Sequence, residues 1–231
     1  MFRQTTLASL VALAISATPI MAQAAAGKGS NADAAKATAT SPAVQAVETV
    51  RTAEALGKYG DAKKDPMALI QAAKMKKEAG EQALTLTRKG KGEAGKKDAK
   101  APDYSVDGML ARAKTLAAGR ADLVALADDV AKSGARGAVG GPKSGRTVVK
   151  GGFTDQFVMK FEGGEPAAVQ ISGDGDSTLD LYVYDENGNR VCAAVGRGDD
   201  AICRWNPKWT GPFTVRVVNR GIANEYSIRT N

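Results

Sequence analysis

Short alternating runs of apolar and polar residues fill positions 157–230 and constrain the fold more than any other feature. Gly, Asp and Asn separate the runs, as expected for strands joined by tight turns. At the centre, residues 179–185 lead into Asn187-Gly188, a pair that accepts the positive φ values of a two-residue hairpin turn. We therefore expect the next strand, at residues 190–194, to return antiparallel.

Seven segments follow this pattern. They are residues 153–162, 167–172, 179–185, 190–194, 201–205, 213–219 and 225–229. So many short strands in so few residues favour two packed antiparallel sheets, that is, a β-sandwich or jelly roll.

The first part of the chain has a helical pattern instead. Ser41-Pro42 and Asp65-Pro66 each place a capping side chain before a proline, a combination typical of helix N-termini. Gly57 and Gly60 are expected to end the first of these helices, so the two form a helical hairpin.

A third helical stretch begins after Ser105, and Gly119 divides it. Together these segments predict a small Ala-rich bundle of three or four helices. The expected fold class is therefore α+β with two domains, in which the helical bundle precedes the antiparallel sandwich.

Changes in composition set the expected boundaries. We assign residues 1–24 to a signal peptide, 25–41 to a flexible segment, 42–132 to the helical domain with a Lys/Gly-rich loop at 88–103, 133–146 to a Gly-rich linker, and 147–231 to the sandwich. Whether the two domains pack together or move independently on the linker is left open by the sequence.

The N-terminus has the pattern of an export signal. Arg3 precedes an apolar run at residues 7–20, and Ala22-Gln23-Ala24 gives the small-x-small cleavage pattern. The run is shorter than the ~20 residues that span a bilayer, so no transmembrane anchor is expected in the mature chain. We expect an exported protein, periplasmic or extracellular.

Cys192 and Cys203 are the two cysteines, and we place them on either side of a hairpin. In an oxidising compartment such a pair tends to form a disulfide. The alternatives are a redox-active pair, which the spacing disfavours because it is not C-x-x-C, and two unpaired thiols.

Histidine is absent, which excludes Ser-His-Asp and Cys-His catalysis and His-ligated zinc. Residues 25–145 hold 21 Lys and Arg against 14 Asp and Glu, whereas residues 146–231 hold 10 against 11. The basic helical half is compatible with a solvated loop or with an anionic envelope surface. No nucleic-acid partner is expected, because the basic segment lacks the interleaved aromatic residues that stack on bases.

The C-terminal part resembles the bacterial pre-peptidase C-terminal domain over about residues 147–231. The residues that carry this resemblance are Leu179-Asp180-Leu181-Tyr182-Val183-Tyr184-Asp185, Asn187-Gly188-Asn189 and Gly211-Pro212-Phe213-Thr214-Val215-Arg216-Val217. The resemblance implies a non-catalytic β-sandwich associated with secretion, targeting or binding to polymers at or outside the cell surface.

Two groups of residues are candidate sites. Asp174, Asp176 and Asp180 offer the oxygens that Ca²⁺ prefers, but their surroundings also fit an ordinary acidic turn. Trp205, Lys208 and Trp209 would suit a platform for a sugar ring or a peptide, although at least one tryptophan of so small a domain is expected in the core. No cofactor other than calcium is suggested.

These observations predict an exported, non-enzymatic binding or scaffolding protein whose partner is an envelope polysaccharide or a secreted protein. One alternative is an accessory subunit or partner of a secreted hydrolase or protease. Another is a hydrolase that uses carboxylates or a Ser/Lys pair. The sequence contains no catalytic motif that would select the second alternative.

Overall fold

The computed structural model describes residues 29–36, 39–89, 95, 102–134, 140–196 and 198–231. The predicted signal peptide lies outside these residues, as does most of the Lys/Gly-rich loop. Within the described part, no helix is long and apolar enough to cross a membrane.

The helices begin where the capping residues predict. They are η1 (Ala34–Lys36), a short 3-10 turn, and the α-helices α1 (Pro42–Lys63), α2 (Pro66–Glu78), α3 (Val106–Leu116) and α4 (Ala121–Lys132). The side chains of Ser41, Asp65 and Ser105 each accept hydrogen bonds from backbone N–H groups of the first turn. Gly119, with φ of +84°, separates α3 from α4.

The predicted end of the first helix was wrong, because Gly57 and Gly60 lie inside α1. A Cβ atom on Gly57 would come within 2.8 Å of the Met109 side chain, and one on Gly60 within 2.9 Å of Leu69. These glycines therefore allow the close approach of neighbouring helices. The helix ends instead at Lys64, which has a left-handed φ of 54°.

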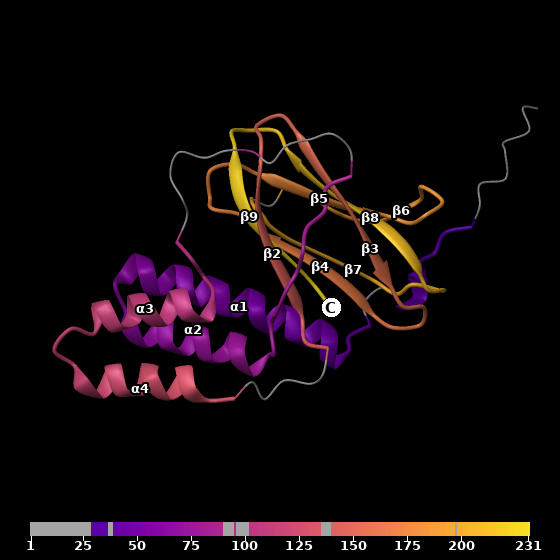
Figure 1. Ribbon diagram of the computed structural model, residues 1–231. Coiled ribbons are helices and arrows are strands. Elements are labelled where there is room, and N and C mark those ends of the chain that lie inside the picture. Colours follow the sequence, from indigo (N-terminus) through magenta and orange to yellow (C-terminus); the bar gives the residue numbers. More distant parts are fainter. Residues whose placement is uncertain (1–28, 37–38, 90–94, 96–101, 135–139, 197) are drawn as a thin grey trace, which may run out of the picture.

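All seven predicted strands are present, and the sequence missed two more. The strands are β1 (Gln82–Ala83), β2 (Lys143–Val149), β3 (Thr154–Phe161), β4 (Ala167–Ser172), β5 (Leu179–Tyr184), β6 (Arg190–Ala194), β7 (Asp200–Trp205), β8 (Gly211–Asn219) and β9 (Asn224–Thr230). One sheet has the order β1-β2-β9-β4-β7 and the other β3-β8-β5-β6. The α+β class with a C-terminal antiparallel sandwich is thereby confirmed (Figure 1).

Strand β2 corrects the predicted linker at residues 133–146. It starts at Lys143 and pairs with β9 along its whole length. The Gly and Lys residues at its start have the composition of a linker. In the structure their backbone N–H and C=O groups belong to a strand that is hydrogen-bonded to its neighbour.

The turn between β5 and β6 is longer than the predicted two-residue hairpin. Asp185 N–H donates to the carbonyl of Asn189 at 2.9 Å, which closes a loop of three residues. Only Gly188 has a positive φ there, 83°. This is the type I turn followed by a left-handed glycine that is common in three-residue hairpins.

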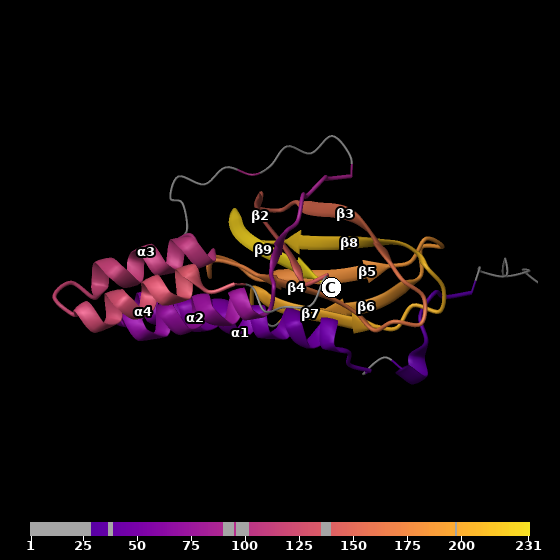
Figure 2. The same ribbon diagram turned by 60° about the horizontal axis from the view of Figure 1, so that its bottom comes forward.

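The helical half packs directly on the five-stranded sheet, and α1 is the helix that lies along it (Figure 2). Val44 and Val47 of α1 form a small buried cluster with Ala168. Every residue of β4 is buried, since one face of this strand meets α1 and the other meets the opposite sheet. The molecule thus has three layers: helices, five-stranded sheet and four-stranded sheet.

A connecting segment, residues 82–89, runs from the helices along the sandwich (Figure 1). At its start β1 pairs with β2, and at its end Arg88 forms a bridge with Phe157 of the other sheet. The Arg88 guanidinium donates to both oxygens of Asp155, at 2.7 and 3.1 Å. Tyr226 donates to the same carboxylate at 2.8 Å, so this buried group accepts three hydrogen bonds from two residues.

The expected flexible segment at 25–41 is only partly in the described residues, and the expectation fails for residues 29–33. Asn31 is fully buried against the sandwich. Residues 29–33 have almost no apolar side chains to bury, and polar contacts hold them in place instead.

The predicted disulfide is confirmed, with a Cα–Cα distance of 5.8 Å between Cys192 and Cys203. The two cysteines do not belong to one hairpin, because β6 and β7 are the outermost strands of different sheets. The bond therefore joins the two sheets along one side of the sandwich.

Replacing both cysteines by alanine should lower the free energy of unfolding by about 2 to 3 kcal/mol, since a short closed loop is released in the unfolded chain. Urea unfolding of the purified protein measures this. Reductant should shift the wild-type transition by a similar amount and leave the double variant unchanged. A wild-type transition that reductant does not move would contradict the prediction.

Candidate functional site

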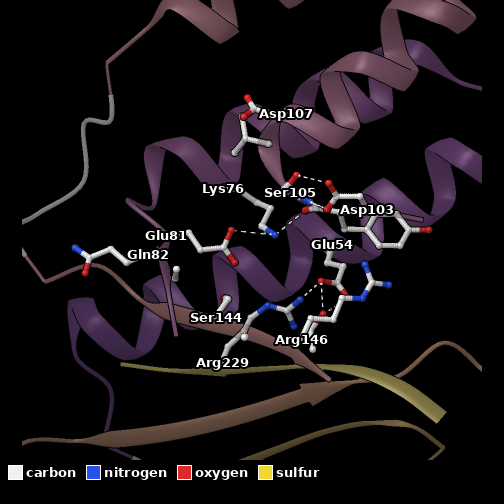
Figure 3. Close-up of a pocket in the computed structure, with 15 residues that line it drawn as sticks. Glu54, Lys76, Glu81, Gln82, Asp103, Ser105, Asp107, Ser144, Arg146 and Arg229 are labelled. Carbon is white, nitrogen blue, oxygen red and sulfur yellow. Dashed lines mark hydrogen bonds and ion pairs between the residues drawn. The ribbon is translucent and has the colours of Figure 1, made fainter. Parts of the chain in front are cut away.

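A polar cleft of about 370 Å³ lies where the helical half meets the sandwich. Figure 3 shows side chains from both halves converging on it. Its lining includes Glu54 of α1, Lys76 of α2, the start of α3, and residues of β1, β2 and β9. The cleft exists only because the two halves pack together.

The ion pair between Glu54 and Arg229 forms the floor of the cleft. Both side chains are buried, with exposed fractions of 3% and 0% for the two residues. The Arg229 guanidinium also donates to the Gln170 side chain, and Glu54 accepts from Ser227 at 3.2 Å. Burial lowers the pKa of Arg229 to about 9, so the group remains charged at neutral pH.

A second ion pair joins buried Lys76 to partly buried Glu81 at the other side of the cleft, with 2.9 Å between Nζ and Oε2. Lys76 Nζ also donates to the backbone carbonyl of Tyr104 at 2.7 Å. These bonds hold α2 against the start of α3. The cleft walls are therefore fixed by charged hydrogen bonds, the strong class of such bonds.

Three polar atoms in these walls are buried without a hydrogen-bond partner among the described residues: Glu81 Oε1, Ser144 Oγ and Arg229 Nε. Leaving a buried polar atom unpaired costs about 1 to 3 kcal/mol. Such atoms are rare in folded proteins and often mark places where water or a ligand binds.

A smaller hollow of about 240 Å³ adjoins the cleft and shares four lining residues with it: Glu54, Tyr104, Arg146 and Ser227. Here Lys58 Nζ donates to Ser172 Oγ at 2.9 Å and to the Gly173 carbonyl at 2.5 Å. In the part of the chain that the structure describes, this Ser/Lys contact is the one that bears on the hydrolase alternative.

The geometry at Lys58 suits a charged ammonium group. Its three potential acceptors are Ser172 Oγ, Gly173 O and, 3.8 Å away, Glu54 Oε1. Three acceptors match the three donors of an ammonium, whereas a general base would have to accept the serine proton. Burial lowers the pKa of Lys58, and Asp199 and Asp200 act against that change.

The structure separates the predicted aromatic platform. Trp205 is 2% exposed and packs edge-on against Phe161, with ring centroids 4.7 Å apart. Trp209 is 41% exposed, and its Nε1 donates to Glu186. Lys208 is exposed beside it, so only these two of the three predicted residues share a surface.

The three predicted calcium ligands do not converge. Asp180 is buried and pairs with Arg220 at 3.2 Å. Asp174 accepts the backbone N–H groups of Asp176 and Glu225, at 3.2 and 2.8 Å. In the described part of the chain no group of three or more His, Cys, Asp or Glu side chains could hold a metal ion. Calcium binding stays a prediction.

The cleft residues were missed at the sequence level. Glu54 lies on a helix with many charged neighbours, and Arg229 ends the last strand, where a charged residue is usual. The available signal was the alternation in β9, which places Glu225, Ser227 and Arg229 on the face opposite Tyr226 and Ile228.

No family model and no curated protein matches the sequence. Several solved structures resemble part of the chain. The pre-peptidase C-terminal domain of a Bacillus anthracis collagenase is 15% identical with a TM-score of 0.31, and the match covers 38% of this chain and 87% of that domain. The domain type expected from the sequence is thus among the structural neighbours, over part of the chain only.

Two other neighbours are binding proteins by description. The Aeromonas hydrophila periplasmic inhibitor of g-type lysozyme, PliG, is 13% identical with a TM-score of 0.32, and the match covers 39% of this chain and 84% of the inhibitor. The carbohydrate-binding module CBM36, in complex with calcium and xylotriose, is 11% identical with a TM-score of 0.28 over 41% of this chain and 91% of the module. Similarities of this size support no conclusion about ligand or family.

Proposed function

We propose that the protein is an exported, non-enzymatic binding module of the cell envelope and that the cleft between its halves holds the ligand. The observation that carries the proposal is the polar cleft of about 370 Å³ on which side chains of both halves converge. Its walls include buried polar atoms of Glu81, Ser144 and Arg229 that have no hydrogen-bond partner among the described residues. A ligand or a bridging water that reached them would supply the missing hydrogen bonds.

An uncharged glycan of the envelope fits the cleft best. The charges in the lining nearly balance. The acidic residues are Glu54, Glu81, Asp103 and Asp107, and the basic residues are Lys76, Arg146 and Arg229. Hydroxyl groups both donate and accept hydrogen bonds, so a polyhydroxylated ligand can pair with either kind of residue without burying a further charge.

Thermal unfolding of the chain from residue 25 with soluble envelope glycans tests this function. A glycan at one hundred times its Kd should stabilise the folded protein by about 2.7 kcal/mol. For a chain of this size the midpoint should rise by roughly 5 to 10 °C. Parallel samples with Ca²⁺ and with a chelator test the calcium prediction.

A matched pair of variants places the site. Gln82→Ala removes an exposed side chain from the cleft lining and should reduce the glycan-dependent shift, whereas Gln71→Ala changes an exposed glutamine of α2 outside the lining and should not. The absence of a shift with any glycan would reject the glycan ligand. Co-purification of a stoichiometric secreted protein would then favour a protein partner, and turnover of an ester or peptide lost in Ser172→Ala would favour the hydrolase alternative.

A further inference from the structure

The end of the sandwich near Trp209 binds the chain's own N-terminal segment. Two turns form this end, one between β5 and β6 and one between β7 and β8. Asn31 inserts between them and has no exposed surface. It lies eleven residues before the first residue of α1, and among the described residues between them only the short turn η1 is regular structure.

The side-chain amide of Asn31 uses its full hydrogen-bonding capacity. Its Oδ1 accepts the backbone N–H groups of Lys208 and Trp209, both at 3.0 Å. Its Nδ2 donates to the Trp209 carbonyl at 3.0 Å and to the Glu186 carboxylate at 3.3 Å. Two acceptor and two donor positions are filled, which is the complete set for a carboxamide.

The backbone around Asn31 is bound as well. The Asn31 N–H donates to Asp185 Oδ2 at 2.8 Å. Two residues earlier, the carbonyl of Gly29 accepts from the Asn187 side chain at 3.1 Å. On the other side, Asp33 N–H donates to the Asn206 carbonyl at 2.9 Å. These polar contacts span residues 29–33. The sandwich therefore recognises the backbone of this segment and one side chain, that of Asn31.

The walls of this site are held by contacts that do not involve Asn31. Asp185 Oδ1 accepts the backbone N–H groups of Asn187 and Asn189, at 3.0 and 2.8 Å. Glu186 accepts from the Trp209 indole. Burial alone would raise the pKa of Asp185, but hydrogen bonds from the Asn31 N–H, from Asn189 and from Asn187 together hold it below its usual value. Because the contacts within the walls already hold the two turns in place, little free energy is lost in ordering the site when a peptide binds.

The arrangement discriminates between similar side chains. Aspartate would place an oxygen against the Trp209 carbonyl and the Glu186 carboxylate, where the amide now donates. Alanine would leave the N–H groups of Lys208 and Trp209 unpaired. We propose that this end of the sandwich is a peptide-binding site specific for an asparagine in a short bent segment. The chain's own residues 29–33 occupy it, and it is open to the same segment supplied in trans.

The test uses the chain from residue 25 carrying Asn31→Asp and a fluorescent peptide of residues 29–36, Gly-Ser-Asn-Ala-Asp-Ala-Ala-Lys. The variant should unfold several degrees below wild type and bind the peptide saturably. Wild type should bind it at least tenfold more weakly, because a tethered segment competes at an effective concentration in the millimolar range. Ser30→Ala is the matched control variant and should unfold and bind the peptide as wild type does. The control peptide has Asp in place of Asn and should bind neither chain.

The proposal is overturned if Asn31→Asp unfolds at the wild-type midpoint, or if the peptide binds wild type and variant equally. Should Asn31→Asp not fold, Asn31→Ala replaces it, since that change introduces no new charge. A wild-type dimer that the Asn31 substitution converts to a monomer would show that the segment of a second copy fills the site, and would overturn the intramolecular assignment.

Discussion

Replacing Glu54 by alanine is expected to lower the free energy of unfolding by about 3 to 5 kcal/mol. The change leaves Arg229 as a guanidinium with no exposed surface and no counter-charge beside it. Burial already lowers the pKa of Arg229, and losing the carboxylate removes its ion-pair partner. Urea unfolding, followed by circular dichroism, measures the effect.

Glu48 supplies the control on the same helix. It pairs with Arg204, but the two side chains are 40% and 35% exposed, so Glu48→Ala should cost less than about 1 kcal/mol. Combining Glu54→Met with Arg229→Met should recover most of the loss, because an apolar pair of similar size can replace a buried ion pair. Equal losses for the two alanine variants would contradict the importance given to the buried pair.

Replacing Trp205 by alanine is expected to cost about 3 to 5 kcal/mol. The indole belongs to the core between the sheets, where it meets Phe161 at 4.7 Å and Phe213 at 5.3 Å between ring centroids. Removing it leaves a cavity that the rigid sheets cannot close. Thermal and urea unfolding should both show the loss.

Trp209→Ala is the comparison, and a cost of about 1 kcal/mol or less is expected because the ring is half exposed. Acrylamide should quench the fluorescence of Trp209 in the Trp205→Ala chain more strongly than that of Trp205 in the Trp209→Ala chain. A surface role for tryptophan would then belong to Trp209 alone. Similar stability losses in the two variants would place both rings in the core and contradict the structure.

The strands between Thr154 and Thr230 were predictable because alternation and turn residues are local signals. All seven segments form strands, and the caps at Ser41, Asp65 and Ser105 mark real helix starts. In each case the residues that decide the structure are neighbours in the sequence.

The parts that failed depend on partners far away in the chain. Strand β2 looks like a linker until β9 is beside it, and Gly57 looks like a helix end until Met109 is beside it. The positions of Asn31 and of the cleft residues also depend on distant partners. Glu54 pairs with Arg229, which is 175 residues away, and no local sequence pattern predicts that contact. The sequence also left open which tryptophan lies in the core. The exposure of Trp205 depends on which face of β7 the other sheet covers.

The two links between the sheets have a consequence for how this protein can associate. A sandwich ordinarily leaves four outer strands with unpaired backbone groups, which invite addition of a strand from another molecule. Here the disulfide joins the outer strands β6 and β7, while the connecting segment, residues 82–89, lies across the opposite side, where β1 pairs with β2 and Arg88 with β3. The connecting segment thus covers one open side by backbone pairing, whereas the disulfide fixes β6 to β7 through their side chains and leaves their outer backbone groups unpaired by each other. Strand addition is therefore disfavoured on the side that residues 82–89 cover, and the edges of β6 and β7 are the side on which a strand from another chain can pair.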